Sequence, residues 1–130
     1  MMAEEVKFTV WVAPAAKPRM TQSDKWKRRP TVLRYRAFAD ELWLAARGMV
    51  DPAGDYGRLL VIAYLPIPQS WSLRKREEAK GKPHRKRKDA SNILKAVEDA
   101  LLKEDSGIWD THLVKYWDDG RGPRVEVRLS

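Results

Sequence analysis

A run of positive charge lies directly before a group of acidic residues in the second half of the chain. Between positions 80 and 88, six of the nine residues are basic, namely Lys80, Lys82, Arg85, Lys86, Arg87 and Lys88. The acidic residues that follow are Asp89, Glu98, Asp99, Glu104 and Asp105. A cationic strip holds a polyanion, and a cluster of carboxylates can hold a divalent metal ion beside it. A metal-dependent nuclease requires this combination.

A helix is predicted over residues 90–102, with Asp89 as its N-cap. The helical period gives it a core side, with Ile93, Val97, Ala100 and Leu101, and an outer side, with Ser91, Asn92, Lys95, Glu98 and Asp99. On an ordinary helix, a pair such as Lys95 and Asp99 is solvated and contributes roughly a few tenths of a kcal/mol. The basic run before the helix and the preference of a helix N-terminus for anions favour a functional surface instead.

Carboxylates that are separated in the sequence but close in space are typical of sites for hard metal ions. Mg²⁺ binds oxygen ligands and keeps several waters, so two or three carboxylates suffice. Glu104 and Asp105 follow the predicted helix directly, where the chain can fold back toward Asp89. The pattern therefore indicates a divalent-metal site beside the basic run.

Hydrophobic patterns predict the strands that must support this helix. Residues 7–12 alternate, as in a strand with one buried side. Residues 58–65 form a nearly continuous apolar run, as in a central strand buried on both faces. Residues 111–117 and 124–129 are also predicted as strands, and the turn sequence D-D-G-R-G-P between them predicts a hairpin.

A second helix is predicted over residues 32–47, where apolar residues recur at helical spacing. Residues 17–30 and 69–88 are polar and basic, and we expect flexible loops there, with a helical part within 72–80. The order of elements is β-α-β-α-β-β. We therefore expect one α/β domain over residues 1–130, with a mixed sheet of about four strands packed with two helices.

The composition limits the class of protein. The formal net charge of +8 and the pI of about 9.9 favour nucleic acid or an anionic surface as partner. A hydrophobic content of 43% is too high for a disordered polyelectrolyte. The absence of cysteine excludes disulfides and thiolate zinc sites. With no apolar run near the ~20 residues of a membrane span and no secretory signal pattern, we expect a cytoplasmic protein without a membrane partner.

Residues 88–101 carry a resemblance to a known family. They read K-D-A-S-N-I-L-K-A-V-E-D-A-L, which resembles the signature of the RusA-type Holliday junction resolvases, roughly D-x-D-N-x-x-K-x-x-x-D-A-L. K-P-R-M-T near the N-terminus and P-I-P-Q-S-W-S-L-R-K-R before the basic run also match, so the resemblance covers most of the chain. It implies a homodimer of α/β subunits, of phage or prophage origin. Such a protein nicks two opposed strands of four-way DNA junctions with Mg²⁺ or Mn²⁺, in recombination and repair.

The resemblance also implies roles for individual residues. The first acidic position, the essential lysine, the helix aspartate and the last metal-binding position fall on Asp89, Lys95, Asp99 and Asp105 respectively. Ser91 departs from the family, which usually has aspartate there, and a hydroxyl is a weaker ligand than a carboxylate. Glu98 is the candidate to compensate, and Glu104 keeps the charge where the family favours aspartate. Lower metal affinity, or a protein that binds junctions and cuts them poorly, are the other outcomes.

The resulting hypothesis assigns catalysis to three residues. Asp89 and Asp105 hold a metal ion that activates water and neutralises charge, and Lys95 stabilises developing charge or protonates the leaving oxygen. The residues expected to contact DNA are Lys17, Arg19, Arg74, Lys75, Arg76, Lys80, Lys82, Arg85, Lys86, Arg87 and Lys88. About six phosphate contacts predict a log–log salt slope near −5.

Several aromatic residues allow two interpretations. Trp26 and Trp71 lie in polar loops, where they either stack on unpaired bases or anchor the loop. Most of Trp11, Trp43, Trp109 and Trp117 are expected in the core or at a subunit interface, and His112 in a structural role. His84 is expected to be a partly charged member of the basic run.

The main alternative is a nucleic-acid-binding protein without catalysis. An RNA-binding module would also explain the high pI. Both need the positive charge but not the acids, which weaken binding to DNA. The acidic residues beside the basic run therefore favour the endonuclease.

Overall fold

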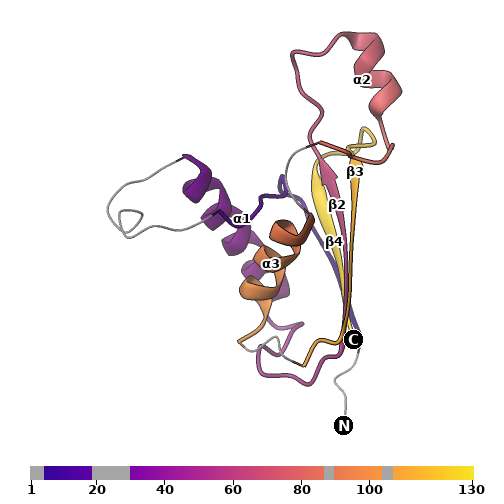
Figure 1. The fold of residues 1–130 in the computed structure, drawn as a ribbon. Coiled ribbons are helices and arrows are strands. Elements are labelled where there is room, and N and C mark those ends of the chain that lie inside the picture. Colours follow the sequence, from indigo (N-terminus) through magenta and orange to yellow (C-terminus); the bar gives the residue numbers. More distant parts are fainter. Residues whose placement is uncertain (1–4, 19–29, 87–89, 104–106) are drawn as a thin grey trace.

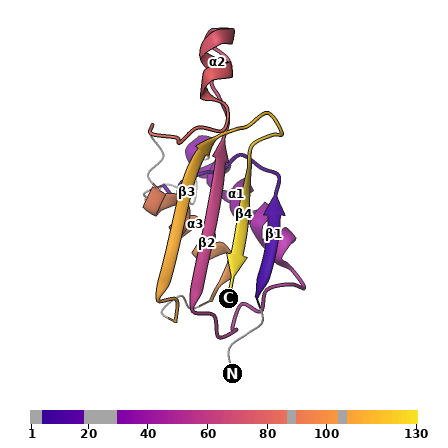
Figure 2. The same cartoon turned by 90° about the vertical axis from the view of Figure 1, so that its right-hand side faces the viewer.

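The computed structural model describes residues 5–18, 30–86, 90–103 and 107–130. Their elements, in chain order, are β1 (Val6–Val10), α1 (Pro30–Ala46), β2 (Arg58–Leu65), α2 (Leu73–Ala79), α3 (Ala90–Leu101), β3 (Asp110–Trp117) and β4 (Arg124–Leu129). Helices α1 and α3 cover one face of a four-stranded mixed sheet (Figures 1 and 2). The expected α/β domain is confirmed, and the helical part foreseen within 72–80 forms a third helix.

Strand β2 lies in the interior of the sheet, as its apolar sequence predicts, but the prediction that it is buried on both faces is wrong. The strand order is β1-β4-β2-β3, with β2 antiparallel to β4 and parallel to β3. Alternate side chains of β2, namely Leu59, Val61, Ala63 and Leu65, are buried toward the helices. The other side chains of β2 lie on the opposite face, which no helix covers (Figure 2).

The predicted hairpin between residues 111–117 and 124–129 is wrong. β4 lies on the far side of β2 from β3, and it pairs with both β2 and β1. The link 118–123 therefore crosses the end of β2, where the backbone N–H of Asp118 donates to the carbonyl of Leu65 at 2.8 Å. Six residues easily span two strand spacings, about 10 Å. An apolar β2 gains a neighbour on each side by this arrangement, which a local turn sequence does not reveal.

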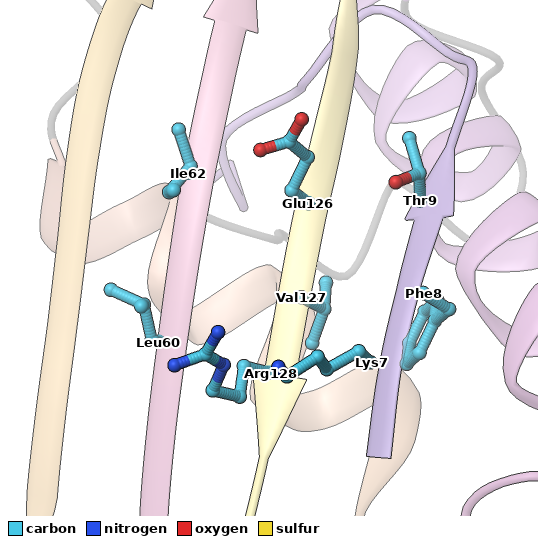
Figure 3. A pocket seen from close by; sticks show the side chains of 8 residues that line it. All are labelled: Lys7, Phe8, Thr9, Leu60, Ile62, Glu126, Val127 and Arg128. Atoms are coloured by element: carbon cyan, nitrogen blue, oxygen red, sulfur yellow. The ribbon is translucent and has the colours of Figure 1, made fainter.

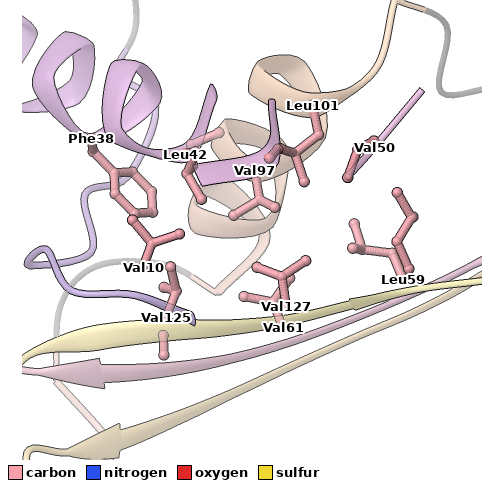
Figure 4. Packing of buried hydrophobic residues seen from close by; sticks show 14 of the residues in the cluster. Val10, Phe38, Leu42, Val50, Leu59, Val61, Val97, Leu101, Val125 and Val127 are labelled. Atoms are coloured by element: carbon pink, nitrogen blue, oxygen red, sulfur yellow. The ribbon is translucent and has the colours of Figure 1, made fainter. Parts of the chain in front are cut away.

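The core fills the space between the two helices and the covered face of the sheet. Phe38 and Leu42 of α1, Val97 and Leu101 of α3 and Val61 of β2 meet there (Figure 4). Each such side chain contributes roughly 1.5–3 kcal/mol on burial. Because α3 buries one face in this core, the backbone of its outer face is held in a fixed place.

Arg124 is buried at the start of β4, with 1% of its surface exposed. Its guanidinium donates two hydrogen bonds to Asp119, at 3.1 and 3.0 Å, and lies 3.7 Å from the ring centroid of Tyr64 and 5.3 Å from that of Trp11. Hydrogen bonds from Arg124 and Arg121 hold the pKa of Asp119 well below its ordinary value. A buried charge needs such partners, so this cluster fastens the β3–β4 link to the sheet.

Residues 66–84 form an arm that projects beyond the end of the sheet (Figures 1 and 2). Helix α2 lies within it, begins after the N-cap Ser72 and buries none of its residues. The chain then returns to the edge of the sheet and pairs with β3. Backbone N–H groups of Gly81 and His84 donate to the carbonyls of Trp117 and Lys115, at 3.2 and 2.9 Å.

Aromatic rings fix the base of the arm. Trp71 contacts Trp117 edge-on, with 5.0 Å between ring centroids, and the ring centroids of His84 and Trp117 are 4.1 Å apart. His84 is only 7% exposed, so the expectation that it belongs to the charged surface is wrong. Trp71 acts as an anchor, which is one of its two predicted roles.

Three further described tryptophans and His112 are exposed. Trp117 is buried, whereas Trp11, Trp43 and Trp109 are 62%, 45% and 68% exposed. The core assignment therefore holds for Trp117 alone. His112 lies on the surface with its Nε2 2.8 Å from the carboxylate of Asp110. Among the described residues, no helix has the length and apolar character needed to cross a bilayer.

Candidate active site

The outer face of α3 carries the described part of the candidate site. Ile93, Ala96, Val97 and Leu101 are buried, whereas Ser91, Asn92, Lys95 and Asp99 are exposed and Glu98 is half-buried. The predicted division into a core side and an outer side is thus confirmed: Ala100 is partly buried against the core, and Ala96 is buried there as well.

Asp99 lies between two lysines. The Lys95 ammonium is 3.2 Å from Oδ1 of Asp99, one helical turn away. The Lys17 ammonium donates a hydrogen bond to Oδ2 of the same carboxylate, which raises the pKa of Lys17 above its ordinary value. The backbone N–H of Lys17 also donates to the carbonyl of Asn92 at 3.1 Å. Lys17 is therefore attached to α3 by both its backbone and its side chain.

This cluster of Lys17, Lys95 and Asp99 carries two positive charges and one negative charge. Because its net charge is positive, it favours a phosphate as neighbour rather than a further cation. Asp99 was a candidate metal ligand in the sequence, but two ammonium groups already occupy its oxygens. A metal ion would have to displace them.

Several assigned residues lie outside the described residues, namely Arg19, Arg87, Lys88, Asp89, Glu104 and Asp105. Asp89 precedes the first residue of α3, and Glu104 and Asp105 follow its last residue by three and four positions. The helix is roughly 18 Å long, so these acids flank opposite ends of it in the sequence. Within the described ranges, no group of three or more His, Cys, Asp or Glu side chains could hold a metal ion.

Ser91 and Glu98 are both on α3 but two turns apart. Seven residues of helix correspond to about 10 Å along its axis. If Glu98 replaces the carboxylate that Ser91 lacks, its side chain must bridge this separation. The helix geometry therefore makes this compensation demanding.

The described basic residues of the arm and of the run that follows it, which precede α3 in the sequence, are called the basic track here. Arg74, Lys75, Lys80, Lys82, Arg85 and Lys86 are exposed, and Arg76 is half-buried. Inside the arm, Arg74 pairs with Glu78 at 3.3 Å and Lys80 with Glu77 at 2.8 Å. Lys75 lies 4.0 Å from the centroid of the Trp71 ring. The arm is thus partly neutralised by its own acids.

The sequence alone does not predict the contact between Lys17 and Asp99. It assigns Lys17 to DNA binding and Asp99 to a metal ion. The two residues are 82 positions apart. Local periodicity carries no signal for such a contact. Lys17 stands at the start of K-P-R-M-T, one of the segments that carry the resemblance described in the sequence analysis, but this segment does not predict a contact with α3.

The comparisons with known proteins place the chain in a family. A family model described as endodeoxyribonuclease RusA matches residues 9–130, from within β1 to the last residue. No match was found among curated protein sequences. The family match includes the arm, the basic run and all of α3. The chain therefore belongs to the RusA family of endodeoxyribonucleases, enzymes that cut within DNA strands.

Proposed function

We propose that this endonuclease resolves four-way DNA junctions by nicking two opposed strands, with Mg²⁺ as cofactor and Mn²⁺ able to replace it. Membership of the RusA family supports Holliday junction DNA as the substrate. The observation that carries the proposal is the position of Lys95, exposed on the outer face of a helix that directly follows the basic run. Such cleavage would take place in the cytoplasm of a bacterial cell, where phage and host DNA recombine.

The residues of the chain would have separate roles in binding and cleavage. Lys82, Arg85 and Lys86 bind backbone phosphates and guide the DNA toward the N-terminus of α3. The N-terminus of a helix favours negative charge, which helps to place the scissile phosphate there. Lys95 then stabilises the charge that develops as the bond breaks.

The metal ion would be held by carboxylates, which are the oxygen ligands that Mg²⁺ prefers. We propose Asp89 and Asp105 as its main ligands and Glu104 as a further one. Ser91 and Glu98 are weaker candidates because of the hydroxyl and of the 10 Å step between them. Bound there, the ion would supply an activated water and neutralise charge on the phosphate.

Cleavage assays on matched DNAs test this function. A labelled four-way junction, a linear duplex of the same sequence and a single strand are incubated with and without Mg²⁺. We expect paired nicks on the junction only, and only with the metal ion. Asp105→Asn should bind the junction but not cut it, whereas Asp55→Asn, in an exposed turn, should behave as the parent. Binding without cutting under every metal ion would support the non-catalytic alternative.

We further propose that the protein works as a homodimer joined through the uncovered face of the sheet. β2 is nearly continuously apolar, and strands of this composition are normally covered on both faces. Leu60 and Ile62 lie on this face beside a hollow of about 270 Å³ (Figure 3). Glu126 and Arg128 lie on it two residues apart and pair within the subunit with Arg124 at 3.6 Å and Glu5 at 3.1 Å, so pairing with a two-fold related copy would extend or replace these contacts.

The oligomeric state tests this surface. Sedimentation velocity should show a dimer for the parent. Ile62→Asp should give a monomer that no longer makes paired nicks. Leu44→Asp, on the exposed side of α1, should remain a dimer. A monomeric parent, or a dimeric Ile62→Asp, contradicts the proposal.

A further inference from the structure

The cluster on α3 poses a problem for the role of Lys95. An isolated pair of Lys95 and Asp99 would hold the ammonium back on the helix. When Lys95 turned toward a phosphate, the carboxylate of Asp99 would be left unpaired beside the anion. Like charges at such short range repel each other. A second cation on Asp99 would remove both difficulties.

Lys17 supplies that cation. We propose that Lys17 is a positioning residue that neutralises Asp99 and thereby frees Lys95 to contact the phosphate that is cut. This inference rests on the proposed cleavage function. It gives Lys17 a role that acts through Asp99 rather than through a direct contact with DNA.

The way in which each lysine is held supports this division of roles. The chain before Lys17 is fixed, because Pro14 and Ala15 are buried and the N–H of Lys17 is bonded to Asn92. Its ammonium is therefore presented to Asp99 from a constrained backbone. Fixing a side chain by its surroundings reduces the entropy that a new contact costs.

The two lysines differ in exposure. The side chain of Lys95 is 49% exposed, compared with 35% for Lys17. Lys17 contacts α3 through both its backbone and its side chain, and the ammonium of Lys95 lies 3.2 Å from Oδ1 of Asp99. The ammonium of Lys95 is therefore the one that a DNA phosphate reaches more readily.

A direct contact between Lys17 and DNA makes a different prediction. In that case, removing Lys17 would slow cleavage and weaken junction binding whether or not residue 99 is charged. If Lys17 acts by neutralising Asp99, its removal matters only while that carboxylate is present. A double-mutant cycle separates the two possibilities.

The cycle compares the parent with Lys17→Met, Asp99→Asn and the double variant. Single-turnover cleavage of a four-way junction is measured with Mg²⁺ and saturating protein. We expect Lys17→Met to slow cleavage about tenfold when Asp99 is present and less than about twofold in the Asp99→Asn background. Lys17→Arg should keep most of the rate, because it keeps the charge.

Two controls accompany the cycle. Arg47→Met removes one exposed positive charge just after α1 and should leave cleavage unchanged. Thermal unfolding of each variant shows whether a slower rate reflects a damaged fold. Lys17→Met keeps the backbone bond to Asn92 and most of the side-chain stem, so we expect its melting temperature to stay close to that of the parent.

Junction affinity without metal provides a readout that does not depend on cutting. Lys17→Met should weaken binding several-fold in the parent background and hardly at all in the Asp99→Asn background. Equal losses in both backgrounds, for rate and for affinity, would overturn the inference in favour of a direct DNA contact. Loss of cleavage in Asp99→Asn alone would also overturn it, since the carboxylate would then be needed for itself. If the parent binds but never cuts, the proposed function fails, and the affinity cycle still decides the role of Lys17.

Discussion

Helices α2 and α3 both carry exposed charge, yet they are supported in different ways. α3 buries four side chains against α1 and the sheet, whereas α2 buries none and projects from the end of the sheet. Charges on α3 are therefore held by the core, at positions that the whole domain determines. Charges on α2 are held only by the arm. Chemistry that needs fixed geometry suits α3, and binding to an extended phosphate backbone suits the arm.

The supports of α2 are local. Its N-cap Ser72 accepts a hydrogen bond from the N–H of Lys75 at 3.2 Å, and the pair of Arg74 and Glu78 lies along its surface. A helix of seven residues is marginal in water by itself. The edge-on contact of Trp71 with Trp117 and the pairing of Gly81 and His84 with β3 therefore direct the arm.

The largest difference between the two helices should appear in stability. Leu101→Ala in α3 removes a side chain that is 2% exposed and should lower the free energy of unfolding by about 2–5 kcal/mol. Leu73→Ala in α2, at 72% exposed, should change it by less than about 0.5 kcal/mol. Urea unfolding of both variants measures this. Similar losses would show that α2 is part of the cooperative core after all.

An intermediate effect is expected at the base of the arm. Trp71→Ala removes a ring pair and a cation–π contact, together worth about 1–2 kcal/mol. The loss should be local, so the backbone amides of Gly81 and His84 should exchange hydrogen faster while the unfolding midpoint changes little.

Trp43→Ala is the matched control for this variant. It removes a tryptophan of α1 that is 45% exposed and should leave exchange in the arm unchanged. Unaltered exchange in Trp71→Ala would mean that pairing with β3 alone holds the arm.

Periodicity alone predicted the parts of the fold that local sequence controls. The apolar run of residues 58–65 indicated an interior strand, and the two sides of α3 followed from helical spacing. The position of β4 could not be predicted in this way. Its turn sequence suits a short hairpin as well as a crossing over β2, and only the demand of β2 for neighbours on both sides decides between them.

The candidate site shows the same limit. The charges of Lys95 and Asp99 on one helix face were predictable because they are four residues apart. The approach of Lys17 to Asp99 depends on the burial of Pro14 and Ala15, which the sequence near Lys17 does not predict. The prediction that His84 belongs to the charged surface is wrong for a similar reason. Its neighbours in the chain are basic, but its neighbour in space is Trp117.

The smallest expected effect concerns single charges of the basic track, and it sharpens the contrast with α3. Lys82→Gln removes one exposed charge near the end of the arm. If Lys82 contacts a phosphate, the log–log slope of junction affinity against salt should become shallower by about 0.9. The free energy of unfolding should not change, because the side chain contributes nothing to the core. Arg47→Gln, which removes a charge just after α1, should leave the slope as in the parent. An equal change in both variants would mean that net charge, rather than a track along the arm, sets the affinity.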